Sequence, residues 1–149
     1  MRVAVAIDHA GIPLRETVFA AVRGGGHELL DLGCQDDYPD TALQAGRAIA
    51  AGDADRAILV CGSGAGVSVA ANKLAGMRAS VCHDHYTAAQ SVVHDDCNML
   101  CLGARVIGPA IAAELTAAFC AARFSGEERH VRRLDKVAAL ERDGLDASR

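Results

Sequence analysis

Residues 57–73 read AILVCGSGAGVSVAANK, a pattern typical of a buried strand, a tight turn and the start of a helix. The apolar run 57–60 does not alternate with polar residues, which indicates a strand covered on both faces. Gly62, Gly64 and Gly66 allow the backbone to turn sharply and to approach a ligand closely. The free amides of the following helix favour negative charge. A reactive thiol at Cys61 would therefore lie beside an anion-binding turn.

Two other interpretations of this stretch are open. A single cysteine at a strand end is often a small buried apolar residue. A glycine-rich turn can also bind a dinucleotide, but the fingerprint G-x-G-x-x-G has Val67 or Val69 at its third glycine position. Asp84 does lie about 20 residues further on, where a ribose-binding acid would stand. The phosphate-binding Walker pattern fails because Lys73 comes too late.

The composition indicates one globular domain. The chain has 149 residues, of which 51% are apolar and 23% charged, enough for a sizeable core. Aromatic residues make up only 3% and the net charge is −4, which argues against a nucleic-acid partner. No apolar stretch is long enough to span a membrane, and no signal peptide opens the chain. The six cysteines form no C-x-x-C pair, so we expect free thiols and a cytoplasmic protein.

The pattern along the chain alternates between strands and helices. We predict strands over 2–7, 27–32, 56–60, 77–82 and 98–102, and helices ending near 23, 51, 74, 93, 123 and 142. This alternation predicts an α/β fold: a doubly wound, Rossmann-like parallel sheet of five strands with helices on both faces, plus a C-terminal helix. The domain would span 1–142, and residues 143–149 would form a disordered tail.

Ligands of such sheets bind beyond the carboxyl ends of the strands. Those ends carry Asp8 and His9, the loop 36–40, the turn 61–66, the segment 83–85 and Arg105. His94 is an exception, because it follows the fourth helix and precedes the fifth strand. It should lie at the opposite edge of the sheet, about 17 Å from Cys61 for a five-residue strand. A catalytic His94 would therefore have to serve the site of a neighbouring subunit; otherwise it is a surface histidine at a helix end.

Motifs spread over residues 1–142 resemble the type B ribose-5-phosphate isomerases, which share a family with the galactose-6-phosphate isomerase subunits. The matching segments are DHAG at 8–11, DYPD at 37–40, CGSGAG at 61–66, ANK at 71–73, GMRA at 76–79, HDDCN at 94–98, GAR at 103–105 and RHVRR at 129–133. The resemblance implies an aldose–ketose isomerase of a phosphorylated sugar, without cofactor or metal. It also implies a homodimer, or a tetramer, with active sites shared between subunits.

The resemblance also implies roles for single residues. Cys61 matches the base that moves a proton through a cis-enediolate, and residues 65–71 offer no competing carboxylate. Ser63 matches a proton relay and His94 the group that opens the sugar ring. Binding roles are implied for the amides of Gly62, Gly64 and Gly66 toward the enediolate, for Asp8 and Tyr38 toward the sugar, and for His9, Arg105, Arg129 and Arg133 toward the phosphate.

One position departs from the family pattern. Asp95 stands where the family usually has Asn, and a carboxylate cannot donate a hydrogen bond. The identity of the substrate sugar is therefore open, with ribose, allose, galactose and erythrose phosphates as the alternatives. A phosphosugar or nucleotide sensor, and one subunit of a hetero-oligomeric isomerase, are the competing functions. For the segment Cys82-His83-Asp84-His85 we expect a helix cap rather than a metal site.

Overall fold

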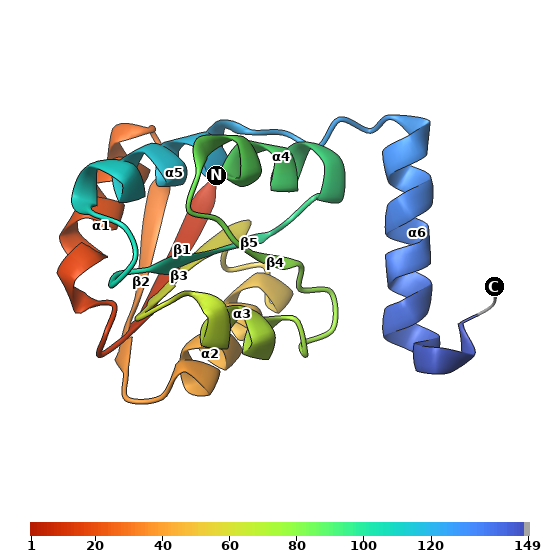
Figure 1. Ribbon diagram of the computed structural model, residues 1–149, viewed down its shortest axis with the longest axis horizontal. Helices are drawn as coiled ribbons and strands as arrows, with labels where there is room; N and C mark the ends of the chain where they lie inside the picture. Colours follow the sequence, from red (N-terminus) through yellow and green to blue (C-terminus); the bar gives the residue numbers. More distant parts are fainter. Residues whose placement is uncertain (148–149) are drawn as a thin grey trace.

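The computed structural model describes residues 1–147 and confirms the doubly wound α/β fold (Figure 1). The five parallel strands are β1 (Arg2–Asp8), β2 (Glu28–Gln35), β3 (Arg56–Cys61), β4 (Ala79–Val81) and β5 (Met99–Gly103). They lie in the order β2-β1-β3-β5-β4. Because the chain moves from β1 to one side and returns to the other side at β3, the topological switch point lies between β1 and β3.

Six α-helices complete the described part of the chain. They are α1 (Arg15–Gly24), α2 (Tyr38–Ala50), α3 (Ala65–Ala71), α4 (His85–Asp95), α5 (Pro109–Ala121) and α6 (Glu128–Asp143). Short 3-10 helices cover Ile12–Leu14 and Gly144–Asp146. Ser148 and Arg149, the end of the predicted disordered tail, lie outside the described residues. None of the helices within residues 1–147 has both the length and the apolar composition required to cross a membrane.

The two faces of the sheet carry side chains of different size. Helices α1, α4 and α5 cover one face and α2 and α3 cover the other (Figure 1). The first face presents large apolar residues such as Ile58, Val60 and Leu100, whereas the second combines small ones such as Ala4, Ala6 and Ala57 with Leu59 and Met99. Both sets are buried, which explains the unbroken apolar runs in the sequence.

Some predicted boundaries near the functional loops were wrong. Strand β2 continues beyond residue 32 to Gln35 through an irregularity at Gly33, whose φ is +78° and where the register with β1 shifts. Helix α2 begins at Tyr38 rather than at residue 41, because Pro39 is suited to the first turn of a helix. Tyr38 is therefore held by a helix and is not part of a loop.

The elements near the edge strand β4 also differ from the prediction. Helix α3 ends at Ala71, and the Asn72 side chain binds both backbone groups of Ala79, at 2.9 Å each. This contact occupies the outer edge of β4, which spans only residues 79–81. Helix α4 continues to Asp95, so His94 lies in its last turn rather than after the helix.

Helix α6 stands away from the layered body of the protein (Figure 1). The chain leaves α5 through a segment that Arg56 secures, since its guanidinium donates to the carbonyl oxygens of Phe119 (2.5 Å) and Ala122 (3.0 Å). Of the residues in α6, His130 alone is buried. Val137 and Leu140 are 47% and 59% exposed, so the helix leaves apolar surface uncovered in a single chain.

Candidate active site

Two strand ends define the floor of a cleft at the topological switch point. Asp8 closes β1 and Cys61 closes β3, and these strands are hydrogen-bonded neighbours. Both side chains are nearly buried, at 6% and 4% exposure. The parallel pairing brings their carboxyl ends to the same edge, as the sequence predicted.

The sulfur of Cys61 accepts a hydrogen bond from a backbone amide. The Gly64 N–H lies 3.1 Å from the Cys61 Sγ. Gly64 reaches this position with a φ of +80°, which a residue with a side chain rarely adopts. A Cβ on Gly64 would also lie only 3.2 Å from the backbone of Leu102. The Gly64 amide is thus directed at the Cys61 sulfur and holds this side chain at the end of β3, beside the glycine-rich turn.

Four other cysteines have a different environment. Cys82, Cys97, Cys101 and Cys120 are buried. Burial raises the pKa of each thiol, to about 12 for Cys97 and about 11 for Cys120, because a thiolate loses its hydration there. All four side chains belong to the core clusters; Cys61 does too, but it also lines the cleft.

The loop after β5 is bound to the Cys61 turn along its backbone. Ala104 N donates to Cys61 O (2.8 Å) and Arg105 N donates to Gly62 O (3.0 Å). Gly103 permits this approach, because a Cβ there would meet the backbone of Ser63 at 2.7 Å. These contacts place Arg105 over the cleft, where a Cβ on Gly62 would lie 3.5 Å from its guanidinium carbon.

The loop after β1 forms the opposite wall. One oxygen of Asp8, Oδ1, accepts from the amides of Ala10 (2.8 Å) and Gly11 (3.1 Å), which stabilises the carboxylate and orders the turn. A Cβ on Gly11 would lie 2.3 Å from Val60 O, so the loop packs directly on β3. His9 Nδ1 donates to Asp36 O at 3.0 Å, because a carbonyl can only accept. Its Nε2 is therefore the nitrogen left for a ligand.

Most of the predicted strand-end residues share one cleft of about 360 Å³. Tyr38 closes it from α2, with its ring against Gly66. The lining consists of Asp8, His9, Ala10, Tyr38, Cys61, Gly62, Ser63, Gly66, Arg105 and Val106. Ala10 and Val106 had not been singled out from the sequence, although each adjoins a predicted site residue. Gly64 lies beneath the cleft and contributes its amide to Cys61.

The remaining predicted residues lie in a second cluster, at the corner where α4 meets α6. The ring of His94 stacks on the ring of His130 with 4.2 Å between centroids. Its Nδ1 lies 2.8 Å from the side-chain nitrogen of Gln90. Gln90 and His130 had not been assigned roles from the sequence. The i, i+4 spacing of Gln90 and His94 can be read from the sequence, whereas the contact of His130 with His94 becomes apparent only when α4 and α6 are placed.

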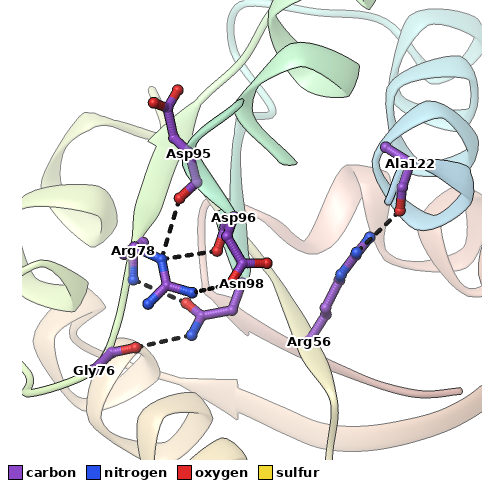
Figure 2. Close-up of polar contacts among 7 residues, drawn as sticks. All are labelled: Arg56, Gly76, Arg78, Asp95, Asp96, Asn98 and Ala122. Carbon is purple, nitrogen blue, oxygen red and sulfur yellow. Dashed lines mark hydrogen bonds and ion pairs between the residues drawn. The ribbon is translucent and has the colours of Figure 1, made fainter. Parts of the chain in front are cut away.

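Figure 2 shows how the end of α4 is fixed. The Arg78 guanidinium donates to the carbonyl oxygens of Asp95 (3.2 Å) and Asp96 (2.8 Å) and pairs with the Asp96 carboxylate (2.7 Å). Asp96, the residue after α4, has a φ of 45°. The Asn98 side chain accepts from Arg78 N (2.9 Å) and donates to Gly76 O (2.9 Å), which links the segment after α4 to the segment before β4. The Asp95 carboxylate points away from Arg78 (Figure 2).

The two phosphate-binding arginines predicted on α6 lie outside the Cys61 cleft. Arg133 and Asp95 line a groove of about 660 Å³ between α6 and the α3–β4 region. Arg129 is more than half exposed and pairs with Glu127 at 2.8 Å. The structure therefore does not bring Arg129, Arg133, His94 or Asp95 to Cys61 within one chain.

The separation of the two clusters follows from strand β5. His94 precedes the start of β5 at Met99, whereas Cys61 is the register partner of Gly103 at its end. The length of a five-residue strand, about 17 Å, thus separates them. This agrees with the prediction that His94 lies at the edge opposite the cleft.

The segment 82–85 serves the structure. Asp84 caps α4 by accepting from Thr87 N (2.8 Å), as predicted. His83 Nε2 accepts from Gly103 N (3.1 Å), and His85 pairs with Glu114 (3.0 Å). Each of these side chains therefore has its own partner. Across residues 1–147 there is no group of three or more His, Cys, Asp or Glu side chains that could hold a metal ion.

Relatives by sequence show the family of the chain. The model of the ribose/galactose isomerase family matches residues 3–137. The chain is 39% identical to ribose-5-phosphate isomerase B of Escherichia coli over 144 residues, covering 94% of this chain and 96% of that protein. It is 34% identical to D-erythrulose-4-phosphate isomerase 2 of Mycolicibacterium smegmatis, covering 95% and 97%.

Solved structures agree with the sequence relatives. The type B ribose 5-phosphate isomerase of Trypanosoma brucei superposes with a TM-score of 0.89 at 46% identity, covering 93% of this chain and 97% of that one. Ribose-5-phosphate isomerase B of Mycoplasma genitalium with bound ribulose-5-phosphate gives 0.86 at 35% identity, covering 95% and 97%. This chain, with its strand-end cleft and its separate histidine corner, therefore belongs to the ribose/galactose isomerase family of aldose–ketose isomerases.

Proposed function

We propose that the protein interconverts D-ribose 5-phosphate and D-ribulose 5-phosphate, with Cys61 as the base. The observation that carries the proposal is the Cys61 sulfur at the floor of the cleft, with the Gly64 amide directed at it. Asp8, the other acidic group at the floor, already holds the loop after β1 by accepting from the amides of Ala10 and Gly11. Residues 65–71 carry no carboxylate.

The reaction needs a proton to move between adjacent carbons. The Cys61 thiolate takes the proton from C2 of the open-chain aldose, and the electron pair forms a cis-enediolate. The resulting thiol returns a proton to C1, and the Ser63 hydroxyl moves a proton between the two sugar oxygens. Unengaged amides of the turn 62–66 would stabilise the enediolate, and one such donor contributes about 3 kcal/mol.

The site would be completed by a second copy of the chain. The cleft offers Asp8, Tyr38, His9 and Arg105 to the sugar and phosphate, whereas His94, which the family resemblance matches to ring opening, lies outside it. In a homodimer, or a tetramer built from such dimers, His94, Asp95, Arg129 and Arg133 would reach the partner's cleft. The uncovered apolar residues of α6 and the groove beside it supply surface for that contact.

A four-carbon phosphosugar is the second candidate substrate. The relative from Mycolicibacterium smegmatis is an erythrulose-4-phosphate isomerase, and Asp95 differs from the usual family residue. Allose 6-phosphate and galactose 6-phosphate are longer alternatives. A carboxylate at 95 would favour a sugar hydroxyl that donates a hydrogen bond.

Steady-state isomerisation of a substrate panel tests the proposal. The panel contains ribose 5-phosphate, erythrose 4-phosphate, allose 6-phosphate, galactose 6-phosphate and free ribose. We expect the highest kcat/KM with ribose 5-phosphate and little turnover of free ribose, because phosphate binding holds the reacting carbons beside Cys61. Equal turnover of ribose and ribose 5-phosphate would overturn the phosphosugar assignment, whereas a preference for another member would change only the sugar.

A further inference from the structure

The His94 ring is held on two sides by residues that the proposed mechanism does not use. Gln90, one turn earlier on α4, places its side-chain nitrogen 2.8 Å from His94 Nδ1. His130 of α6 stacks on the ring with an interplanar angle of 28°. His94 and Gln90 also line a surface hollow of about 330 Å³, so this corner is open to a ligand or a partner. With Nδ1 engaged by Gln90, Nε2 is the nitrogen available to a substrate.

The stacking partner is itself fixed. His130 is 1% exposed, and its Nδ1 lies 2.6 Å from Ser125 Oγ. Ser125 N donates to Val93 O (3.0 Å), which ties the start of α6 to the last turn of α4. Desolvation lowers the pKa of His130, and the neighbouring His94 and Arg129 lower it further. The buried ring offers a flat face to His94.

The side chain at position 90 suits a histidine that changes its protonation state. An amide nitrogen only donates, so in the observed contact Nδ1 accepts and the neutral His94 carries its proton on Nε2. For Nε2 to take up and release a proton, Nδ1 must carry its own proton; a half-turn of the amide then presents its oxygen as the acceptor, in the neutral as in the charged ring. A carboxylate could not donate in the observed contact, and an amine could not accept from a protonated Nδ1.

We propose that Gln90 is a positioning residue whose amide keeps a hydrogen bond to His94 Nδ1, with its oxygen accepting once Nδ1 carries a proton, so that Nε2 alone exchanges protons with the sugar, while His130 fixes the plane of the ring. This inference rests on the proposed role of His94 in ring opening. It assigns Gln90 no contact with the reacting carbons, so the chemistry at Cys61 should not depend on Gln90.

That independence provides the test. Ribose 5-phosphate is mostly a closed ring, whereas ribulose 5-phosphate stays open because its C5 oxygen carries the phosphate. Exchange of the C1 hydrogen of ribulose 5-phosphate with solvent deuterium, followed by NMR, needs the Cys61 step but no ring opening. Turnover of ribose 5-phosphate needs both. The two rates are measured on the same preparation of each full-length variant, so a loss of folded protein would lower both together.

For Gln90→Met we expect ribose 5-phosphate turnover to fall about three- to ten-fold, the effect of one neutral hydrogen bond, with exchange within about two-fold of wild type. Gln44→Met is the matched control, because Gln44 binds only Gln35 on the far side of the sheet from α4, and both its rates should stay at wild type. Unchanged turnover in Gln90→Met, or an equal loss of both rates, would overturn the role of Gln90.

His94→Ala separates this inference from the function on which it rests. If His94→Ala lowers turnover far more than exchange while Gln90→Met changes neither rate, the positioning role of Gln90 is wrong, and the role of His94 in ring opening stands. If His94→Ala leaves turnover at the wild-type level, the proposed role of His94 itself is wrong, and that of Gln90 with it.

Discussion

The cleft at Cys61 and the corner at His94 are built in opposite ways. The cleft is assembled from the ends of neighbouring strands, and backbone hydrogen bonds link its loops to one another. The corner is assembled from two helices that meet through side chains, chiefly Gln90, His94 and His130. The sheet thus sets the position of a reacting group rigidly, whereas the corner depends on how α6 is placed. If both regions serve one reaction, substitutions in the cleft and substitutions at the corner should lower turnover by different amounts.

The largest effect should come from the cleft. Cys61→Ala removes the proposed base and should lower kcat about 10²- to 10⁴-fold with little change in phosphosugar binding. Cys34→Ala is the matched control, because Cys34 is an exposed thiol in β2. Steady-state kinetics and calorimetric binding measure the two effects. Turnover close to wild type in Cys61→Ala would contradict the assignment of the base.

Mixing variants tests whether the two regions meet across subunits. Cys61→Ala and His94→Ala chains should each be nearly inactive. After subunit exchange, about a quarter of wild-type activity should return, because half of the dimers are mixed and each then has one intact site of two. Exchange is checked independently with differently tagged chains. Mixed dimers without recovered activity would show that both residues act within one chain or that His94 has another role.

The arginines of α6 should affect turnover less. Arg129→Ala or Arg133→Ala should cost about 1.5–3 kcal/mol, or about 10- to 150-fold in kcat/KM, if each makes one charge-assisted contact with phosphate. Arg132→Ala on the same helix is the control, since Arg132 is exposed and is not among the predicted phosphate ligands. If kcat/KM were unchanged in both Arg129→Ala and Arg133→Ala, the phosphate would be bound only within the cleft, by His9 and Arg105.

The smallest effect concerns stability at the corner. The pKa of His130 lies below its ordinary value of 6.5, chiefly because the ring is desolvated. As the pH falls below about 6.5, the unfolded chain binds a proton that the folded chain does not, so the free energy of unfolding decreases until the lower folded pKa is reached. In His130→Phe this part of the pH dependence should disappear.

Urea unfolding between pH 5 and 7.5 measures the slope for the wild type and for His130→Phe. His85→Gln serves as the control, because His85 is mostly exposed on the first turn of α4. An identical pH slope in the wild type and in His130→Phe would show that His130 does not contribute to the loss of stability in acid.

The sequence alone determined the cleft. Unbroken apolar runs such as 57–60 require a sheet covered on both faces, and parallel strands must gather their carboxyl ends at one edge. Asp8, Cys61, Ser63 and Arg105 could therefore be placed together before the structure was known. The same rule placed His94 at the opposite edge. These predictions depend on the chain direction and on hydrogen bonding between strands, which local sequence patterns specify.

Only the tertiary structure decided the corner. The contact of Gln90 with His94 follows from their i, i+4 spacing within α4, but the stacking of His130 on His94 depends on how α4 and α6 pack, and no local pattern encodes that relation. The clamp that Arg78 forms on the α4 terminus joins residues 17 and 18 positions apart through side chains, and the +45° φ of Asp96 is part of it. The position of the Tyr38 ring against Gly66 likewise depends on how α2 and α3 pack, although Pro39 already favours an early start of α2. Backbone pairing made the cleft predictable, whereas the corner is specified by side-chain contacts between distant segments.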